Sequence, residues 1–376
     1  MQREYTIFIR EKDGTQGQRL NDYVSLNIVD TLNDLAKWTL KSKAQAECPF
    51  SAGQGISVYR DGDYIFGGVA TEITDTLDAT TGLHDWQVNG SGDLEYLRRR
   101  ICYVDPQTGN PQGAGHYTDT GKLSDVVETL ISLNLGASAL ADRQEAIIGA
   151  YSGASFGDTV SISLRFQNLL DAVKALCIGN GYNIRPVWDI MAKKIHYEAF
   201  QGRDLSQQII FTEQLNNIIS SEYIGTTPEA NFILAGGKGE LTARQFATAE
   251  NADSVAEWGR IEAFQDGRNQ DSIQPYADQT LNSKSDNTQG YSCTASDDTN
   301  APQYMTDYRL GDMVSMKIRG LYIVSEVQQV EINVSDGVER ISPKFGVVAV
   351  SKFRQFFTSL ADLRQDVNEL LGTEVS

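Results

Sequence analysis

The sequence contains little cysteine, histidine or proline, and each shortage disfavours a class of protein. Its 376 residues include 4 Cys, 3 His and 8 Pro. The four cysteines lie far apart and form no CxxC pair, so the spacing indicates no disulfide framework, although an even count permits disulfides. Buried, reduced thiols and folding in a cytoplasm are expected instead. The 33 Gly beside so few Pro favour short strands joined by glycine turns.

Long apolar runs and an excess of positive charge are also missing. No stretch approaches about 18 consecutive apolar residues, so we expect neither a transmembrane helix nor stable membrane insertion. The first apolar run ends at the charges of Arg10 and Glu11 and is not typical of a secretory signal. With 32 Lys and Arg against 50 Asp and Glu, the net charge is −18. That charge argues against a protein that binds nucleic acid electrostatically. It suits a channel wall that repels a polyanion and so lets it pass.

The remaining composition is that of a globular protein, with 40% hydrophobic and 22% charged residues. Alternating apolar residues predict a strand at 5–10. Residues 56–60 and 64–66 flank an Asp-Gly pair at 61–62, which predicts a β-hairpin with a two-residue turn. Further strands of this first β region are expected at 22–28, 67–73 and 83–90.

Helical spacing of apolar residues begins only after residue 100. It predicts helices at 123–131 and 169–177, the second ended by the Gly-Asn-Gly at 179–181. A hairpin is expected from 182–188 and 194–200. The strand pattern then returns, with one more helix at 277–281. The candidate strands lie at 218–224, 231–235, 242–246, 310–316, 321–327, 330–334 and 338–341.

These patterns predict a mainly β protein with an α+β insert. The expected parts are a first β domain at 1–100, an inserted α+β domain at 101–205, a second β domain at 206–345 with a peripheral loop region at 283–303, and a C-terminal amphipathic helix at 346–376.

The C-terminal segment carries an apolar seam whose spacings are 3, 4, 3, 4 and 3 residues. Its members are Phe353, Phe356, Leu360, Leu363, Val367 and Leu370. This is the a/d pattern of a coiled coil, and it extends over about two and a half heptads. A firm assignment of a coiled coil requires about three to four heptads. Two interpretations stay open: an amphipathic helix docked on its own domain, or a self-association seam. We take the six residues as a candidate oligomer interface.

No residue pattern indicates a catalytic, cofactor-binding or metal site. The histidines at 84, 116 and 196 are isolated from one another, and the glycine-rich stretch at 235–240 lacks the hydroxyl that a phosphate loop needs after Lys238. The acidic clusters lack the spacing of a calcium loop. The one basic run, at 98–100, is expected to form salt bridges on a local face. We therefore expect no catalytic residues, no cofactor and no metal.

Stretches from three parts of the chain together carry a resemblance to a known family. They are, in order, 66–69 (FGGV), 86–90 (WQVNG), 94–100, 231–237, 260–268 (RIEAFQDGR), 308–314 (YRLGDMV) and 323–334. This order resembles the tail-tip hub proteins of long-tailed bacteriophages. These are siphovirus minor tail proteins similar to the N-terminal part of tail-associated lysins, and they share a fold with the baseplate hub of contractile phages. The resemblance spans about residues 1–350.

The resemblance implies two tail-tube-like β-barrel domains, smaller α/β domains and a C-terminal helix. Three copies would form a ring at the virion tail tip that joins the tail tube to the tip and gates DNA passage. The implied partners are further copies of the chain, a distal tail protein, tail-tube or tape-measure proteins, and receptor-binding proteins. Viral DNA would pass through without specific binding. Many relatives continue into a peptidoglycan-cleaving domain, for which no room is left before Ser376, so no enzymatic activity is expected.

A second hypothesis is a cell-wall glycan-binding or glycoside-hydrolysing β protein. Its basis is the 16 Tyr, 14 Phe and 4 Trp together with the 50 acidic residues. Aromatic rings and paired carboxylates are what sugar recognition and hydrolysis require. Packing in the protein core also explains the same aromatic residues and is favoured over sugar binding.

Overall fold

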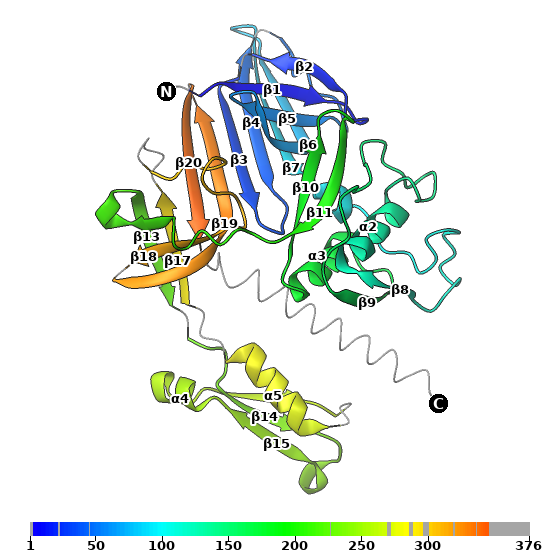
Figure 1. Cartoon of the computed structure of the whole chain (residues 1–376), viewed down its shortest axis with the longest axis vertical. Coiled ribbons are helices and arrows are strands. Elements are labelled where there is room, and N and C mark those ends of the chain that lie inside the picture. Colours follow the sequence, from blue (N-terminus) through cyan, green and yellow to red (C-terminus); the bar gives the residue numbers. More distant parts are fainter. Residues whose placement is uncertain are drawn as a thin grey trace. The chain divides into compact units, whose positions relative to one another are not determined.

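The computed structural model describes residues 3–21, 23–44, 46–225, 227–268, 272–285, 289–295, 301–318, 320–335 and 337–345. The chain divides into two compact units (Figure 1). Unit 1 comprises the described residues of Met1–Ser220 and Cys293–Phe345, and unit 2 comprises the described residues of Ser221–Ser292. The predicted C-terminal helix and its candidate oligomer interface, at 346–376, lie outside the described residues.

Unit 1 is built on one large sheet, which contains eleven strands of the described chain. Their order is β12-β18-β19-β3-β4-β7-β6-β5-β1-β2, with β20 also paired to β19. The strands are β1 (Tyr5–Arg10), β2 (Gln16–Leu20), β3 (Ser25–Thr31), β4 (Lys37–Ala44), β5 (Gly55–Arg60), β6 (Asp63–Asp78), β7 (Leu83–Gly92), β12 (Ile210–Thr212), β18 (Met313–Ile318), β19 (Leu321–Ser335) and β20 (Val338–Phe345).

A strand from the N-terminal part of the chain pairs within this sheet with a strand from far along the sequence. Strand β3 pairs antiparallel with β19, and Ile28 lies opposite Ile332. Both side chains are buried, as alternation on a half-buried strand requires. The mainly β class is therefore confirmed. Within the described residues the sheet does not close into a barrel, so the two-barrel arrangement and the four domain boundaries stay predictions.

The predicted hairpin at 56–66 is confirmed by β5 and β6. Arg60 lies opposite Asp63, which leaves Asp61 and Gly62 as the two turn residues. Their φ angles are 52° and 91°. Two consecutive positive φ angles define the turn whose twist matches that of the strands, and Asp-Gly is well suited to it.

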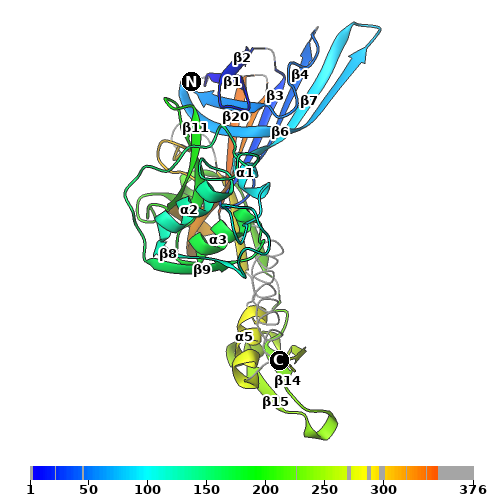
Figure 2. The same ribbon diagram turned by 90° about the vertical axis from the view of Figure 1, so that its right-hand side faces the viewer.

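An α+β part follows the first strands and packs on them. Its elements are α1 (Glu95–Arg98), β8 (Tyr117–Lys122), α2 (Leu123–Asn134), β9 (Thr159–Leu164), α3 (Leu169–Gly179), β10 (Asn183–Asp189) and β11 (Lys194–Phe200). The predicted helices and the β10–β11 hairpin are confirmed. Figure 2 shows α2 and α3 beside β8 and β9. Val69 of β6 and Leu94 belong to the same apolar core as both helices, so this part is anchored directly to the sheet.

Unit 2 contains a three-stranded sheet with order β15-β14-β16. Its elements are β14 (Phe232–Gly236), β15 (Phe246–Glu250), α4 (Ala252–Trp258), β16 (Glu262–Asp266) and α5 (Ile273–Lys284). Ile233 and Ala235 on the sheet pack with Ala277 and Leu281 of α5, which confirms the predicted helix. Strands β13 (Ile218–Gly225) and β17 (Gln289–Ala295) pair on the segments that lead into and out of this unit, so β17 falls within the predicted loop region.

The strand predicted at 242–246 is wrong. Leu241–Ala243 forms a 3-10 turn, Leu241 has a φ of 48°, and β15 starts only at Phe246. The cause is Arg244, whose guanidinium donates to the carbonyl oxygens of Gly236 at 2.9 Å and Gly237 at 3.1 Å. These bonds fold the segment back onto the end of β14 before the strand can begin.

No helix in the described part of the chain is both long and apolar enough to span a membrane.

Candidate functional site at the junction of sheet and helices

A buried ion pair marks the point where the chain leaves β7 and enters the α+β part. Arg10, at the end of β1, donates from Nη1 to Oδ2 of Asp93 at 2.9 Å, and its Nη2 bonds Oδ1 of the same carboxylate. The two side chains are 1% and 3% exposed. Burial alone would lower the pKa of Arg10, but the Asp93 carboxylate raises it well above its ordinary value. The Arg10 guanidinium therefore stays charged inside the protein.

Aromatic groups and glycines enclose this pair. The Tyr197 hydroxyl of β11 donates to the Asp93 carbonyl at 2.8 Å, and the Arg10 guanidinium lies 5.5 Å from the centre of the Trp188 ring. A Cβ atom on Gly67 would lie 2.2 Å from the Tyr64 hydroxyl and 2.5 Å from Nη1 of Arg10. Glycine at this position leaves the space that the guanidinium occupies. The pair thus joins β1, the end of β7 and β11 into one rigid contact.

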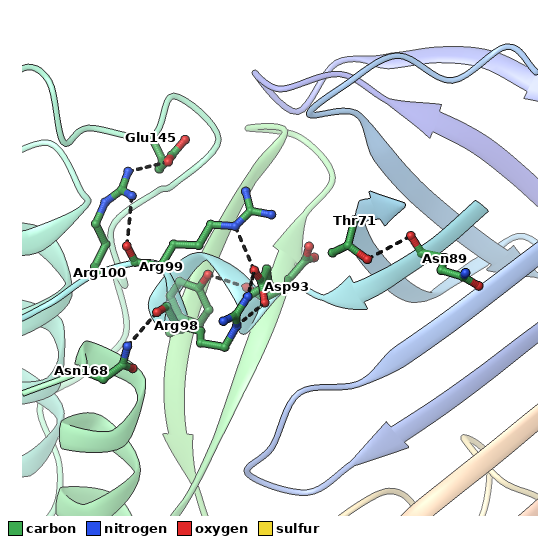
Figure 3. Close-up of polar contacts among 10 residues, drawn as sticks. Thr71, Asn89, Asp93, Arg98, Arg99, Arg100, Glu145 and Asn168 are labelled. Carbon is green, nitrogen blue, oxygen red and sulfur yellow. Dashed lines mark hydrogen bonds and ion pairs between the residues drawn. The ribbon is translucent and has the colours of Figure 1, made fainter. Parts of the chain in front are cut away.

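The basic run at 98–100 follows Asp93 closely in the chain, and Figure 3 shows the three arginines with Asp93. Glu95, whose side chain is buried, accepts hydrogen bonds from Nε of Arg98 at 2.7 Å and from Nε of Arg99 at 3.0 Å. Burial alone would raise the pKa of Glu95, but the hydrogen bonds from the two arginines lower it. Arg100 donates to Glu145 at 2.5 Å. The prediction of a salt-bridged face is therefore confirmed.

A cleft of about 770 Å³ in unit 1 opens near the junction. Its walls come from the end of β3, the β5–β6 turn, β10 and the segment before β18. The lining residues that carry charge or an aromatic ring include Asp30, Arg60, Tyr64, Arg185, Trp188 and Arg309. Arg60 donates to Glu339 of β20 at 2.8 Å, while Tyr64 and Trp188 stack on each other with ring centres 5.9 Å apart. The Arg60–Glu339 hydrogen bond and the Tyr64–Trp188 stacking hold the strands around the cleft together.

Asp30, which lines this cleft, makes the stability of the protein depend on pH. Burial raises the pKa of the carboxyl to about 6, and a hydrogen bond from the Thr31 backbone opposes the rise. Because the folded-state pKa lies above the unfolded one, stability falls as pH rises from about 4 through 6. We expect Asp30→Asn to raise the free energy of unfolding by about 1–3 kcal/mol at pH 8 and to change it little at pH 4. Urea unfolding of both proteins measures this, and an equal effect at the two pH values would contradict the prediction.

The cysteines and histidines are dispersed in the structure as in the sequence. The four cysteines are unpaired, and burial raises the pKa of Cys102, Cys177 and Cys293 to about 12. Nδ1 of His84 lies 2.9 Å from Asp75. Among the described residues, no group of three or more His, Cys, Asp or Glu is placed to hold a metal ion.

Sequence reasoning missed the central pair of this site. Arg10 and Asp93 are 83 positions apart, and each lies in a segment that otherwise indicates only a strand or a turn. The one available signal was an arginine inside the alternating run of β1. The six candidate interface residues of the C-terminal seam lie outside the described residues, so that assignment stays a prediction.

The fold is that of bacteriophage tail proteins. The 43 kDa tail protein of prophage MuSo2 from Shewanella oneidensis is similar at a TM-score of 0.57 and 12% identity, over 91% of this chain and 98% of that chain. A tail protein from Neisseria meningitidis MC58 gives a TM-score of 0.55 at 10% identity, over 91% and 96%. Prophage tail protein gp18 from Listeria monocytogenes EGD-e gives a TM-score of 0.50 at 11% identity, over 96% of this chain and 99% of that chain.

The chain belongs to the family of Siphovirus ReqiPepy6 Gp37-like proteins, because the model of that family matches residues 6–347. No curated protein matches the sequence. The resemblance to bacteriophage tail proteins is thus confirmed in family and fold.

Proposed function

We propose that this protein is a non-enzymatic hub of the phage tail tip, in which three copies form a ring that joins the tail tube to the tip and gates DNA passage. The observation that carries the proposal is the family match over residues 6–347. Distal tail, tail-tube or tape-measure proteins, together with receptor-binding proteins, are the partners that this role implies. The protein would be folded in the host cytoplasm and act in the virion.

The described residues support a scaffold in two ways. The large sheet of unit 1 ties the two sequence segments of that unit together through the β3–β19 pairing. The Arg10–Asp93 pair then fixes the α+β part to the same sheet. A net charge of −18 also suits a channel through which DNA moves, because like charges keep the polyanion from binding.

The C-terminal seam is the proposed contact between copies. Replacing Leu360 and Leu363 with Asp places two charges where the coiled-coil seam would be buried, so we expect self-association to weaken by at least about 100-fold. Light scattering gives the mass, and negative-stain microscopy shows whether the parent protein forms a three-fold ring.

Thr358→Asp with Gln365→Asp is the matched control, because it adds the same charge to the same segment outside the seam. Equal assembly of the parent and the Leu360/Leu363 variant would exclude the seam as the interface. A parent that stays monomeric and binds a cell-wall glycan saturably would favour the glycan hypothesis instead.

A further inference from the structure

Strand β6 has a long edge that is paired on one side only. Strand β5 pairs with β6 from Asp63 to Val69, and the Ala70 amide makes the last contact on that side, with the Gln54 carbonyl at 2.9 Å. On its other side β7 follows β6 as far as Asp78. No described strand pairs with the first side over residues 71–78. Figure 2 shows β6 and β7 extending together away from the rest of unit 1.

This edge is only partly protected against strand addition. Natural edge strands are commonly blunted by proline, by charged side chains and especially lysine, by a bulge or by shortness, and here the only charged side chains along the strand are carboxylates. Residues 71–78 contain neither proline nor lysine, and the one register shift falls at their beginning, between Ala70 and Glu72. A free row of backbone N–H and C=O groups is thus offered over eight consecutive exposed residues.

The two faces of the edge differ in character. Ile73, Asp75 and Leu77 share one face, on which Ile73 is 38% and Leu77 56% exposed. That face continues the apolar side of the sheet, because Ile73 lies opposite the buried Val88. Glu72 and Asp78 lie on the other face, six positions apart. An added strand would therefore meet two apolar side chains and one carboxylate on one side, and the carboxylates of Glu72 and Asp78 on the other.

The charge of the edge indicates which partner fits. Residues 71–83 contain Glu72, Asp75 and Asp78 and no Lys or Arg. Hydrogen bonds from the Cys48 amide and from Thr81 lower the pKa of Asp75 and Asp78, respectively, so both stay ionised. A second copy of the same edge would oppose like charges, whereas a strand with basic residues would pair with them.

We propose that residues 71–78 of β6 accept an extended basic segment of another protein as an additional strand. Backbone hydrogen bonds would hold the segment, and its apolar side chains would cover Ile73 and Leu77. Two Lys or Arg residues six positions apart would face Glu72 and Asp78. The proposal stands on the described strand alone and does not depend on ring formation.

The test uses the full chain and three synthetic peptides, Ac-KVTVTVK-NH2, its Glu counterpart Ac-EVTVTVE-NH2 and the proline-interrupted Ac-KVTPTVK-NH2. We expect the Lys peptide to bind at least about tenfold more tightly than the other two, because only it supplies both an unbroken strand and opposite charge. Hydrogen exchange should show new protection confined to residues 71–78. Binding is followed by anisotropy of labelled peptide.

Two variants make the result specific. Leu77→Lys should reduce binding of the Lys peptide at least about tenfold, because it places a cation on the edge and removes apolar contact. Met191→Lys, a fully exposed position in the β10–β11 turn, adds the same charge elsewhere and should leave binding unchanged. Equal binding of the Lys and Glu peptides, protection outside 71–78, or an edge filled by a second copy of the chain would each overturn the proposal.

Discussion

Replacing Asp93 with alanine should lower the free energy of unfolding by about 3–5 kcal/mol, because it leaves the buried Arg10 guanidinium without its counter-charge. Arg10 is 1% exposed and cannot reach water without moving β1. The neutral Gly68 carbonyl, 3.3 Å from Nη2, supplies no charge and cannot replace a carboxylate. Denaturant unfolding followed by circular dichroism measures the loss.

Two comparisons separate a buried charge from simple loss of contact. Glu4→Ala breaks the pair with Arg19 at 3.3 Å, where both side chains are exposed, and should cost about 0–1 kcal/mol. The double variant Arg10→Met with Asp93→Leu removes both charges and should cost less than Asp93→Ala. If Asp93→Ala is no more costly than Glu4→Ala, the pair does not hold the two parts together.

The sequence indicated those parts of the fold whose cause is local. The 3.6-residue spacing of Leu123, Val126, Val127 and Leu130 is sufficient for a helix, and α2 forms there. The Asp-Gly pair similarly determined the β5–β6 turn. Strand β4 was missed although Trp38 and Leu40 alternate with exposed Lys37 and Lys41, so its signal was present in the pattern.

Pairings between distant segments had no comparable signal. In the β3–β19 contact, Asn27 donates to Glu331, 304 positions away, and no spacing within either strand indicates the other. The same holds for the buried Arg10–Asp93 pair. The open edge of β6 depends on where β5 ends, which follows from tertiary packing. The candidate site could therefore be recognised only in the structure, whereas the family resemblance could be recognised from the order of short sequence segments.

Trp38 of β4 should be the other position with a large effect. It is 1% exposed, packs on Phe50 with ring centres 6.3 Å apart, and lies over Gly90, where a Cβ atom would come within 2.2 Å of its ring. Trp38→Ala opens a cavity in the middle of the sheet that the strands cannot close. We expect a loss of about 3–5 kcal/mol in the free energy of unfolding, measured with denaturant.

The controls for Trp38 test whether volume, rather than the indole N–H, accounts for the loss. Within the described structure that N–H is buried and has no hydrogen-bond partner, so Trp38→Phe removes no favourable polar contact and should cost less than about 2 kcal/mol. Trp258→Ala, at a 36% exposed position in α4, should cost about 1 kcal/mol. A phenylalanine variant as unstable as the alanine variant would mean that the indole is held by a polar contact. In that case the space that Gly68 and Gly90 leave beside the indole would be needed for its polar contact, rather than for close packing of the ring.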